Sequence, residues 1–416
     1  MSHLFTWRII LTAIVGACVG HLSAEVRKPH GTFASSGAFD QTIYEHSELK
    51  GVLVRVLWSE IEPSPGVFNF TAVNRQIAAV EQNGKPWSLA VIGGGLGSPE
   101  WLTGELGAPY FDYSFRGESG YHLPHFWNAT VQGRLAEMAQ ALGTEYGSNP
   151  NLALVYVTQM TSNGIEGHLQ GVDMNGFTSA GYTDQRWIDA SCQVARAFAA
   201  AFPEQPLAFE VHNINGAATV PKQIINTLWN DASLEHRVGA AIWWISGRTS
   251  YQSELIEELK AFPGDVYGQV IARSDQTERI EAGTLASVFS QAREIGMRYI
   301  EPWEYEFKNG ENGANGTWDT ELAAYNAWSE AVYGVEALTG VNFQGTSVEG
   351  GFLVSWLGAA GATYHVEKSP DLSEWDFLAE KVVTTGGNVA VTDTKITGLT
   401  SSYYRLRLVD VEIDSE

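Results

Sequence analysis

The chain has 416 residues, of which 44% are hydrophobic and 12% aromatic, including 14 tryptophans. This composition supports a large apolar core and excludes an intrinsically disordered chain. The length suggests about two domains at roughly 100–200 residues each. The formal net charge of −23 disfavours nucleic acids and anionic membrane surfaces as partners. It also disfavours strongly anionic polysaccharides, unless the binding cleft is locally basic.

The N-terminal residues have the pattern of an export signal. Arg8 precedes an apolar run over residues 9–19, which is too short to span a bilayer, and small residues follow it. We therefore expect residues 1–24 to be a signal peptide. The alternative is a lipid anchor at Cys18, because residues 15–18 loosely resemble a bacterial lipobox. Either way the protein leaves the cytoplasm and is expected outside the cell, in the periplasm or on the cell surface, with no membrane span.

The second cysteine, Cys192, lies in an amphipathic helical pattern over residues 187–198. A buried and unreactive thiol is expected there rather than a nucleophile. No disulfide is expected, so the fold depends on its core.

Short apolar runs rich in β-forming residues alternate with longer helical patterns. The runs predict strands at residues 30–33, 51–58, 86–92, 152–158, 206–212, 238–245, 265–272 and 297–303. The helical patterns lie at residues 72–83, 131–146, 185–201, 253–261 and 282–295. These repeated units predict an α/β fold, a (β/α)8 TIM barrel over residues 25–335, with catalytic groups at the C-terminal strand ends. A doubly wound open sheet is the alternative topology.

One long stretch, residues 93–129, is rich in glycine, proline and aromatic residues and follows the third predicted strand. Loops at that end of a barrel are free to vary and often bind ligands, so we expect this stretch to border the binding site.

The pattern changes at about residue 336, where helical spacing stops and strand alternation begins. Phe352, Val354 and Trp356 alternate with polar residues in one such run. Residues 336–416 are therefore predicted to form a small β-sandwich. The segment 363–375 and the end of the chain resemble fibronectin type III-like accessory domains of secreted bacterial proteins, which implies a spacer or a polysaccharide-binding module.

The second predicted strand ends in a recognisable run. It reads W-S-E-I-E-P over residues 58–63 and P-G-V-F-N-F over residues 65–70. This run resembles the second strand of clan A glycoside hydrolases, such as family 10 xylanases and family 42 β-galactosidases, and residues 84–86 and 98–102 fit the same pattern. The resemblance covers residues 50–170 well and the rest by spacing. It implies a glycosidase that cleaves a poly- or oligosaccharide, with retention and without a cofactor.

Glycoside hydrolysis needs two carboxylates that flank one bond. In clan A the general acid/base glutamate follows the fourth strand, often after an asparagine, and Glu166 with Asn163 nearby fits that place. The clan's nucleophile ends the seventh strand, but here that strand has no glutamate. Glu301, ending the eighth predicted strand, is our first choice for the second carboxylate, because glutamates among aromatic residues are costly to hold without a purpose. Asp275 and Glu304 are the alternatives.

Substrate contacts are expected from aromatic and polar residues at the strand ends. Aromatic faces stack on sugar C–H surfaces, and arginine can hold hydroxyl groups or a carboxylate. Trp303 has the place of the clan's eighth-strand tryptophan. The candidates are Trp58, Asn163, His212, Trp243, Arg248, Trp303 and Glu304. One of Trp243 and Trp244 is expected in the core, because successive strand residues face opposite sides.

Two other motifs do not complete a site. The glycine-rich residues 93–97 lack the spacing of a dinucleotide-binding loop. His122 and His125 have a proline between them and no zinc signature around them, so no metal site is expected. The absence of a G-x-S-x-G elbow argues against a serine esterase. The remaining alternatives to a glycosidase are a non-catalytic carbohydrate-binding barrel and a scaffold for protein contacts.

Overall fold

The computed structural model describes residues 26–334 and six C-terminal segments: 344–348, 351–358, 362–369, 376–383, 387–394 and 403–411. The expected signal peptide, with Cys18, lies outside the described residues, as does the predicted domain boundary near residue 336.

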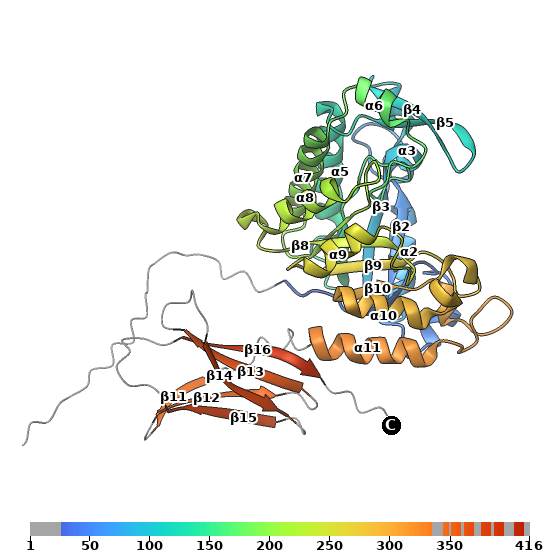
Figure 1. Ribbon diagram of the computed structural model, residues 1–416. Coiled ribbons are helices and arrows are strands. Elements are labelled where there is room, and N and C mark those ends of the chain that lie inside the picture. The colour runs from blue at the N-terminus through green and yellow to red at the C-terminus, as the bar shows by residue number, and fades with distance from the viewer. Residues whose placement is uncertain are drawn as a thin grey trace, which may run out of the picture.

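Eight parallel strands close into a barrel in the order β1-β10-β9-β8-β7-β6-β3-β2 (Figure 1). The strands are β1 Gly31–Ala34, β2 Gly51–Leu57, β3 Trp87–Ile92, β6 Leu152–Tyr156, β7 Leu207–Glu210, β8 Val238–Ile245, β9 Val266–Val270 and β10 Met297–Glu301. Every predicted barrel strand is confirmed, and the closed order excludes the doubly wound sheet. The predicted (β/α)8 barrel is thereby confirmed.

Helices on the chain between the strands surround the barrel (Figure 1). The longer ones are α2 Thr71–Gln82, α5 Ala129–Tyr146, α7 Asp184–Ala201, α8 Thr219–Trp229, α9 Ser253–Ala261, α10 Leu285–Ile295 and α11 Asp319–Tyr333. The short ones are α1 Trp58–Ile61, α3 Gly94–Gly97, α4 Glu100–Thr103 and α6 Met174–Ser179, with 3-10 turns η1 Gln41–Glu45, η2 Ala232–Leu234, η3 Thr277–Arg279, η4 Glu281–Gly283 and η5 Glu304–Phe307. The five helical patterns correspond to α2, α5, α7, α9 and α10. Within the described residues, no helix has the length and apolarity that crossing a membrane requires.

The barrel strands separate two apolar cores, because successive side chains on a strand face opposite sides. On β2, Val52 and Val54 pack outward in the large core between strands and helices. Leu53 points inward and joins the smaller core inside the barrel, together with Tyr156 and Tyr299. The same alternation directs the next inward residue of β2, Arg55, toward the C-terminal end of the barrel.

The stretch expected to be a loop after the third strand contains a hairpin. Strands β4 Tyr110–Phe115 and β5 Glu118–Pro124 pair antiparallel. Tyr113 is buried in this hairpin, and its hydroxyl donates a hydrogen bond to the Ser162 carbonyl. The hairpin therefore supports the loop that follows β6.

The C-terminal strands form two antiparallel sheets of three strands each, in the orders β11-β12-β15 and β14-β13-β16. Their bounds are β11 Gln344–Val348, β12 Gly351–Gly358, β13 Ala362–Ser369, β14 Asp376–Val382, β15 Gly387–Asp393 and β16 Tyr403–Val411. Trp356 and Val391 of one sheet share a buried cluster with Tyr364 and Val366 of the other. The two sheets thus face each other across a common core, as the predicted β-sandwich requires.

Cys192 is buried on α7, as the helical pattern predicted. Burial raises the pKa of this thiol to about 11, so it stays protonated and unreactive at neutral pH.

Candidate active site

A cavity of about 730 Å³ lies at the C-terminal ends of the barrel strands, where TIM barrels place their active sites. This volume suits a small ligand or a few sugar units. Its aromatic lining consists of Trp243, Trp244, Tyr251 and Trp303, and its charged lining consists of Arg55, Arg116, Glu166 and Arg279. Among the described residues, Glu166 is therefore the only carboxylic acid on the cavity wall.

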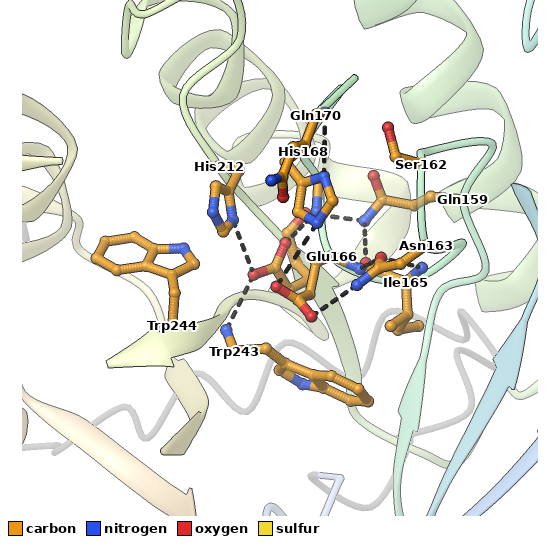
Figure 2. A network of polar contacts seen from close by, with 12 residues as sticks. Gln159, Ser162, Asn163, Ile165, Glu166, His168, Gln170, His212, Trp243 and Trp244 are labelled. Carbon is orange, nitrogen blue, oxygen red and sulfur yellow. Dashed lines mark hydrogen bonds and ion pairs between the residues drawn. The ribbon is translucent and has the colours of Figure 1, made fainter. Parts of the chain in front are cut away.

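Glu166 belongs to the loop between β6 and α6, and Asn163 fixes its position. The Asn163 side-chain oxygen accepts a hydrogen bond from the Glu166 backbone N–H at 2.9 Å, and its amide nitrogen donates to Glu166 Oε1 at 2.6 Å. Figure 2 shows Glu166 between Asn163 and His168, with contacts to both. The asparagine three residues before the glutamate thus orients the carboxyl group.

Glycine backbones hold this loop against the loop that follows β3. Gly93 N–H donates to the Gly164 carbonyl at 3.2 Å, and Gly95 N–H donates to the Thr161 carbonyl at 3.0 Å. Gly164 has a φ of +83°, and a Cβ added there would lie 2.0 Å from the Gly93 carbonyl oxygen. Only glycine permits this approach without displacement. The glycine-rich residues 93–97 therefore support the Glu166 loop.

The environment of Glu166 raises the pKa of its carboxyl group, so both protonation states are populated near neutral pH. Burial is the largest cause that raises its pKa to about 7, and the nearby Glu210 carboxylate adds to the increase. His212 and the hydrogen bond from Asn163 act in the opposite direction. The side chain retains 23% exposure, so it meets the cavity. A carboxylic acid with such a pKa can donate and accept a proton near neutral pH.

Glu210, at the end of β7, supports this group from behind and was not predicted. It is fully buried, and its carboxylate accepts hydrogen bonds from the backbone N–H groups of Gly167 and Trp243, the latter at 2.9 Å. Burial also raises the pKa of Glu210 well above its ordinary value. Glu210 thereby ties the Glu166 loop to β8. The available sequence signal was its position two residues before His212 on the same predicted strand, which directs both side chains to the same face.

Two histidines complete the polar wall around Glu166. His168 Nε2 lies 3.8 Å from Glu166 Oε2, and the rings of His168 and His212 are 5.2 Å apart. Burial lowers the pKa of His168 to about 3 and that of His212 to about 4. Both rings are therefore neutral at physiological pH and offer hydrogen bonds to a ligand rather than positive charge.

Glu301, the predicted second carboxylate, lies behind the cavity wall. It is fully buried, and its carboxylate accepts hydrogen bonds from Tyr156 at 2.8 Å, from Tyr299 at 2.5 Å and from Gln269 at 2.8 Å. Burial raises its pKa to about 7, against the effect of these donors. Gln269 lines the cavity, so one side chain separates Glu301 from the space where a ligand would lie.

The tryptophans after β8 and β10 reach the cavity as predicted. Trp243 belongs to the core inside the barrel and Trp244 to the outer core, which agrees with the expected alternation, although both also line the cavity. Trp303 is half-buried, and its indole N–H donates to the Val270 carbonyl at 2.9 Å. This anchoring fixes the ring while part of its face remains open to a ligand.

Besides Glu301, four predicted site residues lie outside the cavity lining, because each has a local partner. Trp58 is fully buried and donates to Glu62 at 2.7 Å, so its predicted substrate contact is corrected to a packing role. Arg248 donates to the Glu278 carbonyl.

The two alternative carboxylates are also held elsewhere. Asp275 pairs with Arg273 at 2.7 Å on the surface. Glu304 accepts a hydrogen bond from Ser36. Neither side chain lines the cavity.

The described residues contain no cluster of three or more histidine, cysteine, aspartate or glutamate side chains arranged to hold a metal ion. The chemistry that the wall offers is thus proton transfer by Glu166, hydrogen bonding by amides and neutral imidazoles, and stacking on tryptophan.

The sequence matches no model of a known protein family and no curated protein. Solved structures with a similar fold include endo-glycoceramidase II from Rhodococcus sp., with 12% identity over 88% of this chain and 96% of that chain at a TM-score of 0.45. Xylanase 10B from Thermotoga petrophila has 12% identity over 66% and 82% at a TM-score of 0.42. An exo-β-1,4-mannosidase from Opitutaceae bacterium strain TAV5 has 12% identity over 73% and 60% at 0.44. Similarity at this level defines neither a reaction nor a substrate for this chain.

Proposed function

We propose that this chain is a glycoside hydrolase that cleaves O-glycosidic bonds of a poly- or oligosaccharide. One observation carries the proposal: Glu166, with a pKa near 7, meets a cavity at the catalytic end of a TIM barrel that is lined by tryptophans. Tryptophan faces suit sugar rings, and a carboxylic acid that is protonated near neutral pH suits a glycosidic leaving group.

In this proposal Glu166 transfers the proton. Its protonated carboxyl group gives the proton to the glycosidic oxygen as the bond to the anomeric carbon breaks. In the retaining route the resulting carboxylate then accepts a proton from the attacking water, whereas in the inverting route Glu301 accepts that proton. Asn163 keeps the carboxyl group oriented through both steps, because its amide donates to one carboxylate oxygen and leaves the other available.

Glu301 is the proposed second carboxylate, either as nucleophile or as the base that activates water. Its neighbour Gln269 lines the cavity, and Arg55, which also lines it, favours the ionised form of Glu301 electrostatically. Direct attack on the anomeric carbon requires Gln269 to move aside, since its amide now bonds to Glu301 Oε2. Retention of anomeric configuration is expected if Glu301 is the nucleophile, and inversion if it activates water.

The test is a comparison of the purified chain with its Glu166→Gln variant on a broad panel of oligosaccharides. We expect the turnover number to fall about 10²–10⁴-fold, the usual contribution of a general acid/base. Glu145→Gln is the matched control, because Glu145 is exposed on α5 outside the cavity. Full activity of Glu166→Gln would remove this residue from the mechanism.

A second candidate function is sugar binding without turnover. It is favoured by the amide of Gln269 at the end of β9, where clan A enzymes have their nucleophile, and by the complete burial of Glu301. Oligosaccharide binding with no product after prolonged incubation would favour this candidate over a hydrolase.

The proposal places the hydrolase outside the cytoplasm, in keeping with the signal pattern of residues 1–24. The C-terminal sandwich is proposed to be a fibronectin type III-like spacer, because Trp356 and Tyr364 are buried between its sheets rather than displayed.

A further inference from the structure

The cavity differs in charge from the protein that surrounds it. The whole chain has a formal net charge of −23. The cavity lining, in contrast, has three arginines, Arg55, Arg116 and Arg279, and a single acid, Glu166. Since both lining histidines are neutral near pH 7, the wall is positive whether or not Glu166 is ionised. Salt screens charges beyond about 8–10 Å, so the nearby arginines dominate the field inside the cavity.

The side chain of Arg55 extends from β2 into the cavity and has no fixed partner. It is half-buried on β2, facing Ala90 of β3, whose small side chain leaves room beside it. Its guanidinium makes no hydrogen bond or ion pair with any residue that the structure describes. Arg55 favours the ionised form of Glu301, whose carboxylate already accepts three hydrogen bonds from other side chains. Because Arg55 lines the cavity, a ligand there can supply acceptors for its guanidinium.

The other two arginines come from separate segments around the cavity. Arg116 lies at the turn between β4 and β5, with its guanidinium 4.9 Å from the Phe115 ring centre. Arg279 ends η3, after β9, and contacts the Gln276 side-chain oxygen at 3.4 Å. Both are exposed, and neither forms an ion pair with a described residue. Three independent segments therefore direct positive charge to one space.

We propose that the ligand of this cavity is an anionic saccharide, whose carboxylate or sulfate group binds the Arg55 guanidinium at the floor. This inference rests on the proposed glycosidase function and specifies its substrate class. A guanidinium presents two parallel N–H donors, which match the two oxygens of a carboxylate or sulfate group. Arg116 and Arg279 stabilise further negative charge on neighbouring sugar units at the entrance.

The experiment measures binding by calorimetry with the full chain carrying Glu166→Gln, so that the ligand is not consumed. The probes are an oligouronide, its uncharged methyl ester, a sulfated oligosaccharide and a neutral oligosaccharide of the same length. We expect the oligouronide or the sulfated probe to bind at least tenfold more tightly than the ester and the neutral probe. Whichever of the two anions binds more tightly identifies the group that Arg55 holds.

A second Arg55→Gln substitution in this background should remove the preference for the anion, while Arg75→Gln, on the exposed face of α2, should retain it. If Arg55→Gln does not fold, Arg279→Gln at the exposed entrance tests the same charge and should reduce the preference about threefold. Equal affinity for acid and ester, or tighter binding of the neutral probe, overturns the inference.

These outcomes are distinct from a failure of the proposed function. Hydrolysis of neutral oligosaccharides by the native chain, with no preference for anions, would support the proposed hydrolase function and overturn only the proposed substrate class. No binding and no hydrolysis of any saccharide would overturn both.

Discussion

Two buried glutamates of the barrel have nearly the same acidity and opposite surroundings. Burial raises the pKa of both Glu166 and Glu301 to about 7. Glu166 lies on a loop after β6, receives one side-chain hydrogen bond and keeps part of its surface open to the cavity. Glu301 ends β10, receives three side-chain hydrogen bonds and has no exposed surface.

The difference shows that a raised pKa marks burial, whereas access decides chemistry. A desolvated carboxyl group becomes a functional candidate only when one of its oxygens can reach a reacting atom. Glu166 satisfies both conditions. Glu301 satisfies the first, and it satisfies the second only if the hydrogen bond from Gln269 opens.

The largest expected effect concerns the turnover number of Glu301→Gln. If both glutamates act on one glycosidic bond, this variant should lose about as much activity as Glu166→Gln, roughly 10²–10⁴-fold. Steady-state kinetics on the best substrate of the panel, with folding checked by circular dichroism, measures the loss. Activity within threefold of the native chain would show that Glu301 is a structural group and that it does not act with Glu166 on one glycosidic bond.

The next effect is on stability and its dependence on pH. The folded-state pKa of Glu301 lies near 7, above the ordinary value of 4.5. Its favourable contribution is therefore present below about pH 4.5 and is lost as the pH rises through 7, because the buried group must ionise. As the pH rises from 4.5 to 8, the native chain should lose about 3 kcal/mol of unfolding free energy that Glu301→Gln keeps.

Urea unfolding of both chains across this pH range measures the difference. Glu166→Gln should show a smaller gain, since solvent screens its partly exposed carboxylate. Parallel stability curves for the native chain and Glu301→Gln would contradict the raised pKa of the buried group.

The smallest expected effect concerns the support of the Glu166 loop. In Gly164→Ala the new methyl group would lie 2.0 Å from the Gly93 carbonyl oxygen, so the loop must shift and move Glu166. We expect the turnover number to fall about tenfold, since a displacement of this kind misplaces a catalytic group. Gly84→Ala is the matched control, with a φ of +67° but no atom within 4 Å of the new Cβ. Equal activity losses in the two variants would contradict a specific role of the interlocked loops.

The fold was predictable because the barrel strands are apolar runs, most of them next to a helical pattern, although the helices α8 and α11 were not predicted. The hairpin β4–β5 was not, since β5 contains polar residues, a glycine and a terminal proline and therefore lacks a clear strand pattern. The stretch of residues 93–129, which contains the hairpin and the glycine-rich residues 93–97, was expected only to border the site. Their contacts with the Glu166 loop depend on residues distant in sequence, which no local pattern encodes.

The site was predictable where a side chain follows directly from strand direction. His212 and Trp243 reach the cavity in this way, whereas Glu166 lies on the loop after β6 and was located through the resemblance to clan A. Side chains with a nearby partner do not reach the cavity. Asp275, for example, pairs with Arg273, which lies two residues before it in the sequence. The alternation that explains Leu53 could also have placed Arg55 inside the barrel, but a single charged residue in an apolar strand gave no hint of its purpose.

The hydrogen bond from Tyr113 to the Ser162 carbonyl sets a condition for engineering this protein. The turn of the hairpin, residues 116–117, is separate from that contact and could be replaced by a foreign sequence to alter which oligomers are accepted. A graft that also removed Tyr113 would remove the hydrogen bond that supports the loop carrying Glu166, so changes in selectivity would then be inseparable from losses in rate.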